Sequence, residues 1–302
     1  MKDNPPEENL TEANNPNTQN LDQLSSLQMV ELINREDKKI GDAVFDQRQQ
    51  IAKSIDHIAH AFLSGGRLIY LGAGTSGRLG VLDAVECPPT FSSNPGQVIG
   101  LMAGGSGALV TAVEGAEDSP VSGQLDLKEV KLCERDIVVG IAASGTTPYV
   151  LGAIAYANSL GAETIGICCN RGAELTRIAK VGIELIVGPE VLSGSTRMKS
   201  GTATKMVLNM LSTGAMVKTG KSYGNLMVDL RATNHKLLNR AVKLVEEVTG
   251  ASRTQAQQLL DDCNNEVKTA IVCHQRHLTP EKSRELLARF DQRLRPALEN
   301  NE

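Results

Sequence analysis

The sequence has few aromatic residues and no excess of positive charge. It contains four Tyr, four Phe and no Trp, which argues against a surface that stacks on nucleic acid bases or sugar rings. The formal net charge of −4 gives no electrostatic basis for binding nucleic acid or an anionic membrane. Glycine is abundant instead, with 28 residues in a chain of 302. This composition suits one or two domains with an aliphatic α/β core and tight turns.

The cysteine pattern and the N-terminus both indicate a protein of the cytoplasm. The six cysteines include no C-x-x-C pair and no metal-ligand spacing, so we predict reduced thiols and no metal site. Residues 1–20 are rich in Asn, Pro and Glu and contain no apolar stretch. They therefore resemble neither a signal peptide nor a membrane span, and we expect them to form a flexible arm.

Five short apolar segments alternate with helical segments, which predicts an α/β fold with a doubly wound five-stranded parallel sheet. We expect helices before the sheet, from Leu21 and from Ala43 to Leu63, and a long buried helix after it, near 199–218. The expected strands are 67–72, 97–103, 136–143, 163–169 and 183–188, with helices near 76–86, 107–116, 148–160 and 173–179.

The charge pattern changes after Asn234, where apolar strand-like runs cease and short charged helical segments follow. We therefore predict a larger α/β domain over 21–234, with its core at about 58–221, and a small all-α domain over 235–302 of about four helices.

The loop after the first predicted strand is the first candidate binding site. Residues 72–78 (GAGTSGR) lead from a strand into a helix N-terminus, where free N–H groups and the helix dipole favour an anion. The loop also satisfies the dinucleotide fingerprint, but the second predicted strand ends without the acidic residue that would hold a ribose. We predict a phosphomonoester, and a glycine turn without a ligand is the alternative. The candidate contacts are Gly74, Thr75, Ser76 and Arg78.

A second hydroxyl-rich loop follows the third predicted strand. Ordinary N-capping explains one hydroxyl in residues 143–148 (ASGTTP), but not three. In a doubly wound sheet the loops after the first and third strands flank the point where the strand order reverses, and ligands bind there. The two loops therefore predict one phosphate pocket. This loop contributes Ser144, Gly145, Thr146 and Thr147.

Both loops resemble those of the sugar isomerase (SIS) domain, which binds phosphosugars. Residues 188–199 (GPEVLSGSTRMK) are similar to a signature shared by the glucokinase regulatory protein and the bacterial N-acetylmuramic acid 6-phosphate etherases. Residues 83–90 (DAVECPPT), 113–119 (VEGAEDS) and 224–229 (GNLMVD) extend the resemblance to the etherases over nearly the full length.

The resemblance implies a lyase that cleaves the D-lactyl ether of N-acetylmuramic acid 6-phosphate, giving N-acetylglucosamine 6-phosphate and D-lactate in cell-wall amino sugar recycling. In the open-chain sugar, C2 lies next to an aldehyde, so a carboxylate can remove its proton. Lactate leaves from C3 as its oxygen is protonated, and water adds across the double bond. Two carboxyl groups in opposite protonation states can perform both halves without a metal or an organic cofactor.

By resemblance the catalytic pair is Glu86, the acid that protonates the ether oxygen, and Glu117, its partner base. We expect each at the C-terminal end of a helix, where the negative end of the dipole favours the protonated form of a carboxyl group. Solvated helix ends are the simpler interpretation without the resemblance. Asp83, Glu114 and Asp118 lie close enough in sequence to compete for the two roles.

The signature adds further candidates at the start of the long helix. Cations at a helix N-terminus oppose the dipole, so we predict an anion there, either the phosphate or the lactyl carboxylate. Glu190 is a candidate to open the sugar ring, with a structural ion pair as the alternative. The candidate ligands of the anion are Ser195, Thr196, Arg197 and Lys199.

Two rival functions remain at this point: a non-catalytic regulator that binds a sugar phosphate and a partner enzyme, and a phosphosugar isomerase. The helix after the first loop also bears on assembly. If it runs unbroken from Ser76 to Glu86, it separates the glutamate from the phosphate loop by roughly 15 Å, beyond the reach of one sugar phosphate. We therefore expect a homodimer with active sites shared between chains.

Overall fold

The computed structural model describes residues 9–229 and 235–300, and these form two compact units. The first unit takes in the chain up to Val85 and Gly96–Ser212. The second takes in Glu86–Pro95 and the chain from Thr213 onward.

The first unit is built on a parallel sheet with the strand order β2-β1-β3-β4-β5. The chain passes from β1 out to β2 and returns to β3 on the other side of β1, so the strand order reverses between β1 and β3. This arrangement confirms the predicted doubly wound sheet. The strands are β1 (Leu68–Gly72), β2 (Val98–Met102), β3 (Ile137–Ile141), β4 (Glu163–Cys168) and β5 (Val181–Glu184).

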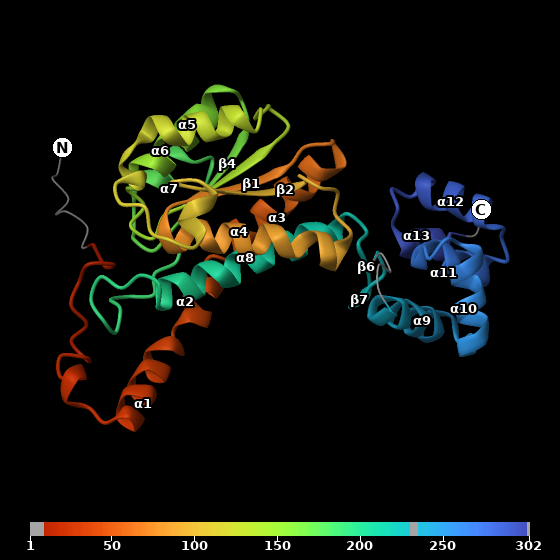
Figure 1. The fold of residues 1–302 in the computed structure, drawn as a ribbon, viewed down its shortest axis with the longest axis horizontal. Helices are drawn as coiled ribbons and strands as arrows, with labels where there is room; N and C mark the ends of the chain where they lie inside the picture. Colours follow the sequence, from red (N-terminus) through yellow and green to blue (C-terminus); the bar gives the residue numbers. More distant parts are fainter. Residues whose placement is uncertain (1–8, 230–234, 301–302) are drawn as a thin grey trace. The chain divides into compact units, whose positions relative to one another are not determined.

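Helices cover both faces of the sheet, which explains why β1 and β3 are apolar and buried along their whole length. In Figure 1, α5, α6 and α7 lie on one face, and α3, α4 and α8 lie on the other. The helices are α3 (Arg48–Leu63), α4 (Gly74–Phe91), α5 (Pro120–Glu129), α6 (Pro148–Ser159), α7 (Glu174–Ile178) and α8 (Lys199–Lys218).

Two shorter helices precede the sheet, α1 (Ser26–Asp37) and α2 (Ile40–Asp46), after a 3-10 turn at Leu21–Gln23. A capping box of Ser25 and Gln28 starts α1. The prediction of a single helix from Ala43 to Leu63 is wrong, because the helix is interrupted at Gln47, between α2 and α3. The Gln47 side chain accepts a hydrogen bond from the backbone N–H of Glu184 on β5, at 3.1 Å.

The predicted helix near 107–116 is wrong. This stretch holds only two 3-10 turns, η2 (Ser106–Leu109) and η3 (Ala116–Asp118), and the helix of this crossover is α5. Gly104, Gly105 and Gly115 take positive φ angles of 85°, 73° and 70°, a left-handed conformation that a helix cannot contain. Ser119 then caps the N-terminus of α5, which starts with proline at a favourable position.

Helix α8 begins and ends where the sequence predicts, but it is not buried all round. Thr202, Lys205, Asn209, Thr213 and Val217 are exposed. Their spacing of three or four residues places them on one side of the helix. Within one chain α8 is therefore buried on one side only, and its burial against a second subunit stays a prediction.

The prediction of a flexible N-terminal arm does not hold for residues 9–20, whereas residues 1–8 lie outside the described part. Thr11, Asn15 and Thr18 are buried. Asn170, which follows β4, accepts a hydrogen bond from the backbone N–H of Thr11 at 3.2 Å. Polar side chains bind this segment to the first unit, so its low apolar content does not leave it free.

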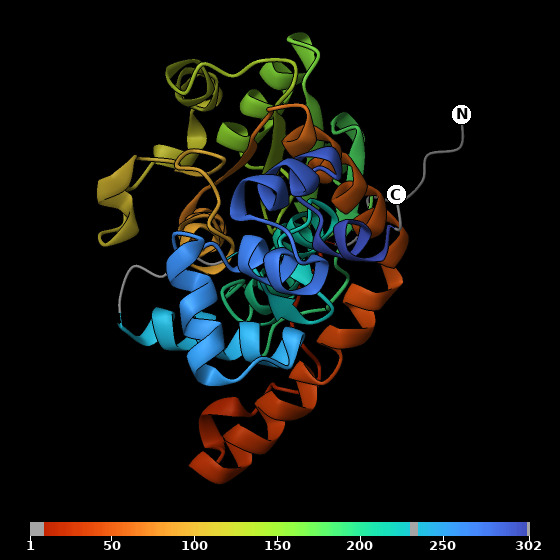
Figure 2. The same cartoon turned by 90° about the vertical axis from the view of Figure 1, so that its right-hand side faces the viewer.

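The second unit is helical and has its own hydrophobic core. Its described helices are α9 (His235–Thr249), α10 (Arg253–Asp262), α11 (Val267–Arg276), α12 (Pro280–Arg289) and α13 (Leu294–Glu299), one more than predicted. They are coloured from cyan to dark blue in Figure 2. Residues from Val267 to Cys273 of α11 are all buried, so α11 is the central helix.

A short antiparallel hairpin, β6 (Ser222–Tyr223) and β7 (Leu226–Met227), belongs to the same unit. Tyr223 and Leu226 pack against the helical core. This packing ties the chain before residue 230 to the C-terminal helices, and the domain boundary at residue 235 stays a prediction.

Candidate active site

The two hydroxyl-rich loops lie next to each other because they follow adjacent parallel strands. Gly72 at the end of β1 pairs with Ile141 at the end of β3. A Cβ atom at Gly72 would lie 2.9 Å from the Ile141 carbonyl oxygen and 2.8 Å from the Gly77 nitrogen, so only glycine fits. The backbone at Gly72 therefore passes close to the end of β3. Helix α4 begins just after it, at Gly74, next to the loop that precedes α6.

A pocket of about 190 Å³ opens at this point, and every residue that lines it belongs to the first unit. It brings together the two loops, the turn that carries Glu117, the start of α8 and the N-terminal segment. Its polar lining residues are Thr11, Glu12, Thr75, Ser76, Glu117, Ser144, Thr147, Thr196, Ser200 and Thr204.

The second loop presents its hydroxyl groups to this pocket. Thr147 is the N-cap residue of α6, yet its side chain makes no capping hydrogen bond. Ser144 Oγ accepts a hydrogen bond from the Thr146 backbone N–H, at 3.2 Å. Gly145 is buried with φ of 73°, and a Cβ atom there would lie 2.4 Å from the Ala173 Cβ. Thr146 and Gly145 therefore shape the loop, while Ser144 and Thr147 line the pocket.

A second pocket, of about 320 Å³, adjoins the first and shares Ala73, Gly74 and Glu117 with it. Arg78 lines this second pocket only. Its Nε donates to the carbonyl oxygen of Leu109 at 3.0 Å and its Nη2 to that of Ala108 at 2.7 Å. Arg78 therefore holds the η2 turn, and the predicted contact between Arg78 and the phosphate of the first pocket is not supported.

Glu117 lies where the predicted chemistry requires a carboxylate, but not at the end of a helix. It is exposed within η3, three residues before the proline that starts α5, and it lines both pockets. The expected helix C-terminus is absent here because residues 110–115 form no helix, and Gly115 with φ of 70° leads into a 3-10 turn instead. The position of Glu117 comes from the turn alone.

Glu86 lies inside α4 and lines neither of these two pockets. The expectation of a helix end is wrong, because α4 continues through Pro88 and Pro89 to Phe91. The helix is unbroken from Gly74, so Glu86 lies about 18 Å along the axis from its start. Its side chain is exposed.

The nearby rival Asp83 is already engaged in the fold. Its Oδ2 accepts a hydrogen bond from the Tyr70 hydroxyl at 2.8 Å, and its Oδ1 accepts one from Ser212 Oγ at 3.1 Å. These bonds join α4 to β1 and to α8, so Asp83 has a structural role.

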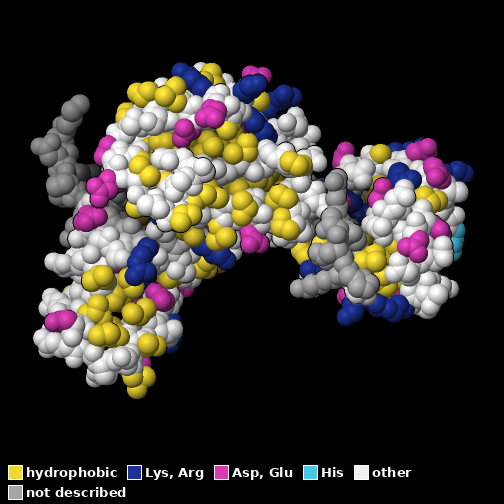
Figure 3. Space-filling view, in the orientation of Figure 1, with side chains coloured by type: hydrophobic (Ala, Val, Ile, Leu, Met, Phe, Trp, Pro, Cys, Tyr) yellow, Lys and Arg dark blue, Asp and Glu magenta, His cyan; other side chains and the backbone are white. Residues whose placement is uncertain are grey.

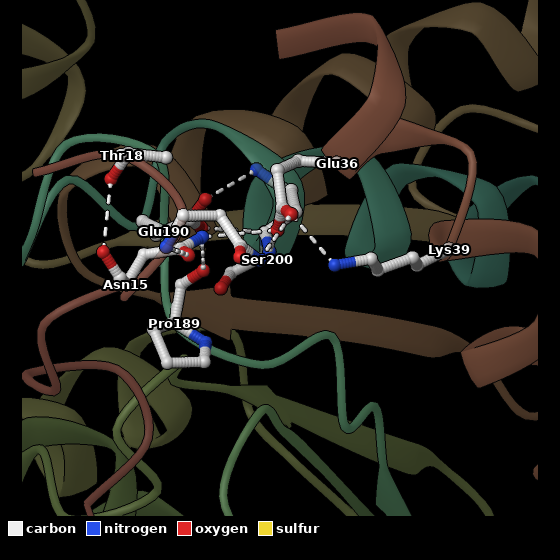
Figure 4. A network of polar contacts seen from close by, with 9 residues as sticks. Asn15, Thr18, Glu36, Lys39, Pro189, Glu190 and Ser200 are labelled. Atoms are coloured by element: carbon white, nitrogen blue, oxygen red, sulfur yellow. Dashed lines mark hydrogen bonds and ion pairs between the residues drawn. The ribbon is translucent and has the colours of Figure 1, made fainter. Parts of the chain in front are cut away.

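Glu190 (Figure 4) and Lys199 of the signature also bond to other residues of the chain. Glu190 has no exposed surface, and its two carboxylate oxygens accept the backbone N–H groups of Lys199 and Ser200, each at 2.9 Å. It therefore caps the N-terminus of α8. Since Lys199 is also buried and turned to Glu36, the prediction that these two residues contact substrate is wrong.

Glu36 on α1 is the partner of Lys199, with Nζ to Oε2 at 2.9 Å. Burial alone would raise the pKa of Glu36, but hydrogen bonds from Lys199, Lys39 and Asn15 outweigh it and lower the pKa to about 2. The cation that we predicted as an anion ligand thus neutralises a buried carboxylate of the chain itself.

Of the remaining signature residues, only Thr196 lines the first pocket. Arg197 is exposed, and Ser195 is half-buried with its backbone N–H bonded to the Leu192 carbonyl oxygen at 3.0 Å. Their contacts with substrate stay predictions. The structure adds Thr11 and Glu12 to the lining of the first pocket, from the segment that we had predicted to be a flexible arm.

Comparisons with known proteins agree with this architecture. The N-terminal SIS domain of glucokinase regulatory protein matches residues 50–158, the SIS domain matches 129–214, and the C-terminal lid domain of glucokinase regulatory protein matches 224–263. The N-acetylmuramic acid 6-phosphate etherase of Rhodopirellula baltica is 55% identical over 93% of both chains. The chain belongs to the N-acetylmuramic acid 6-phosphate etherase family. The member from Pectobacterium atrosepticum is 53% identical over 96% of this chain and 95% of its own.

Solved structures confirm the fold of this etherase family member at a greater distance. The phosphoheptose isomerase from Neisseria gonorrhoeae is 13% identical and covers 63% of this chain and 98% of its own, with a TM-score of 0.50. At this identity the likeness concerns the SIS fold alone. Among the described residues, no helix is long and apolar enough to cross a membrane, and no group of three His, Cys, Asp or Glu side chains could hold a metal ion.

Proposed function

We propose that the chain is a carbon–oxygen lyase that converts N-acetylmuramic acid 6-phosphate into N-acetylglucosamine 6-phosphate and D-lactate. The observation that carries this proposal is one pocket that combines the hydroxyl groups of two helix-starting loops with the carboxylate of Glu117. The identity of 55% to a named etherase supports the same reaction.

The phosphate binds at the hydroxyl loops. Ser76 and Thr75 lie in the first turn of α4, and Thr147 and Ser144 lie at the start of α6. Two helix N-termini and four hydroxyl groups thus converge on one point, and free N–H groups there favour an anion without a cationic side chain. The rest of the sugar then extends toward Glu117.

The reaction needs one base and one acid. Glu117 removes the C2 proton, the C2–C3 double bond forms, and the C3–O bond to lactate breaks as Glu86 protonates the ether oxygen. Water then returns a hydroxyl to C3 and a proton to C2. After lactate has left, Glu117 is protonated and Glu86 is ionised. These are the states that the addition of water requires.

The distance from Gly74 to Glu86 along α4 is the reason to propose that two chains form each active site. An open-chain sugar phosphate held at Gly74 is too short to reach Glu86 about 18 Å along the same helix. We therefore propose a homodimer in which Glu86 serves the sugar bound by the partner copy. Hydrophobic side chains gather over α4 and α8 (Figure 3). Leu82 and Val85 of α4 and Met210 of α8 are exposed.

We place this activity in the cytoplasm, in the recycling of amino sugars from the cell wall. All six cysteines are free, as is usual in a reducing compartment.

Incubation of the purified protein with N-acetylmuramic acid 6-phosphate tests the activity. Release of D-lactate together with N-acetylglucosamine 6-phosphate is expected. Tight binding of the sugar phosphate without any lactate would instead support a regulator that binds the same ligand. No specific observation favours an isomerase.

A further inference from the structure

The pocket contains a second carboxylate that the reaction as described does not use. Glu12 lines it together with Glu117 and the hydroxyl groups of both loops. Its Oε2 atom lies 3.4 Å from the place where a Cβ atom at Gly194 would stand. The carboxylate therefore lies between the signature loop and the pocket.

The residue before Glu12 is tied to the second phosphate loop through Asn170. The Asn170 Oδ1 atom accepts the backbone N–H of Thr11 at 3.2 Å. Its Nδ2 donates to Thr11 Oγ1 at 3.2 Å and to the Ser144 carbonyl oxygen at 3.1 Å. One amide side chain thus connects the N-terminal segment to the loop that carries Ser144.

The residues after Glu12 are tied to the signature. Asn15 Nδ2 donates to Glu36 Oε2 at 3.0 Å and to the Pro189 carbonyl oxygen at 3.1 Å (Figure 4). Ser193 Oγ donates to Asn14 Oδ1 at 2.9 Å. The backbone is therefore anchored on both sides of Glu12, which keeps this residue beside the pocket.

Glu12 has no structural task of its own. Within the described ranges 9–229 and 235–300, its carboxylate makes no hydrogen bond or ion pair. A carboxylate accepts hydrogen bonds and cannot donate them when ionised. Beside an anion site, an ionised carboxylate repels the bound anion, unless hydrogen bonds from the bound molecule to the carboxylate offset the repulsion. Hydroxyl groups of a sugar are donors that fit this requirement.

We propose that Glu12 contacts the bound sugar and accepts hydrogen bonds from its hydroxyl groups. The proposal rests on the proposed function, because it takes the ligand to be a sugar phosphate. The negative charge of Glu12 also repels the phosphate and the lactyl carboxylate. It therefore favours the one orientation in which the phosphate lies at the hydroxyl loops and the neutral part of the sugar faces the N-terminal segment.

The test compares Glu12→Gln with Glu31→Gln, an equal loss of charge at an exposed position of α1. D-lactate release gives kcat and KM, and calorimetric titration gives the affinities for N-acetylglucosamine 6-phosphate and for inorganic phosphate. For Glu12→Gln we expect kcat/KM and the sugar phosphate affinity to fall about tenfold or more. The affinity for inorganic phosphate should stay equal or rise, since a repulsive charge has gone, and the melting temperature should not change.

Three results would overturn the proposal. The first is a wild-type kcat/KM and a wild-type sugar phosphate affinity in Glu12→Gln. The second is a parallel loss of inorganic phosphate binding and thermal stability, which indicates a structural role. The third is the same loss in Glu31→Gln. If the wild-type protein releases no D-lactate, the proposed activity fails, whereas the contrast between the two titrations still decides the role of Glu12.

Discussion

Lys199 donates a hydrogen bond from Nζ to Glu36 Oε2 at 2.9 Å, and both side chains are almost completely removed from solvent. This ion pair joins the first helix of the chain to the start of α8. Glu36→Gln keeps the shape of the side chain but leaves the Lys199 charge buried without its partner. We expect a loss of about 3–5 kcal/mol in the free energy of unfolding at neutral pH, measured by urea denaturation.

Lys39 offers a matched control, because its side chain is 54% exposed and pairs with the same carboxylate. Lys39→Met should cost less than about 1 kcal/mol. The pH dependence gives a second measurement. The folded pKa of Glu36 is lowered to about 2 from 4.5, so its contribution is complete above pH 4.5 and is lost as the pH falls toward 2. That contribution is about 3 kcal/mol. Equal acid sensitivity of the wild type and Glu36→Gln would contradict this role.

The two glutamates that we propose as catalytic can be tested by isosteric substitution. Glu86→Gln and Glu117→Gln should each keep the fold and bind the sugar phosphate, but lose about two or more orders of magnitude in kcat. Asp118→Asn is the matched control, because Asp118 is exposed next to Glu117 and lines neither pocket. Near-normal turnover in either glutamine variant, or a comparable loss in Asp118→Asn, would move the role to another carboxylate.

The hydroxyl groups of the loops should act on binding. Ser76→Ala and Ser144→Ala each remove one phosphate contact, and phosphate contacts persist from substrate to transition state. We therefore expect KM to rise by a larger factor than kcat falls, measured by D-lactate release over a range of substrate concentrations. A loss confined to kcat would place these hydroxyl groups at the reacting carbons instead.

Subunit mixing tests the shared active site. Glu86→Gln lacks the acid, and Ser144→Asp adds a charge that repels the phosphate, so each homodimer should be nearly inactive. A heterodimer regains one intact site if Glu86 serves the partner copy. An equal mixture after complete exchange should therefore recover about a quarter of wild-type activity. Proven exchange without recovery would place both contributions in one chain.

The sequence predicts the sheet of this protein because its strands are short, apolar and bounded by glycine. β1 and β3 are neighbours with Gly72 paired to Ile141, as expected for the two strands between which the strand order reverses. The same reasoning places Ser76 and Ser144 at one pocket, since adjacent parallel strands end at the same edge. Hydrophobic periodicity also defines α8 from Lys199 to Lys218.

The same reasoning fails where single polar contacts over long separations decide the structure. From the sequence, Lys199 at a helix N-terminus resembles an anion ligand. In the structure it is neutralised by Glu36, which is 163 residues away in sequence. The segment around Thr11 looks disordered because it has few apolar residues, and its order depends on Asn170, 159 residues away. No local sequence pattern predicts either of these two pairings.

The anchoring of residues 9–20 has a consequence for the start of the polypeptide. A shortened chain that began at Met29 would retain every strand of the sheet and both hydroxyl loops. It would lack Glu12 at the pocket and Asn15 at Glu36, so one wall of the pocket would be missing while the scaffold remained. Such a product would keep the sheet but lack the carboxylate that we propose for sugar recognition.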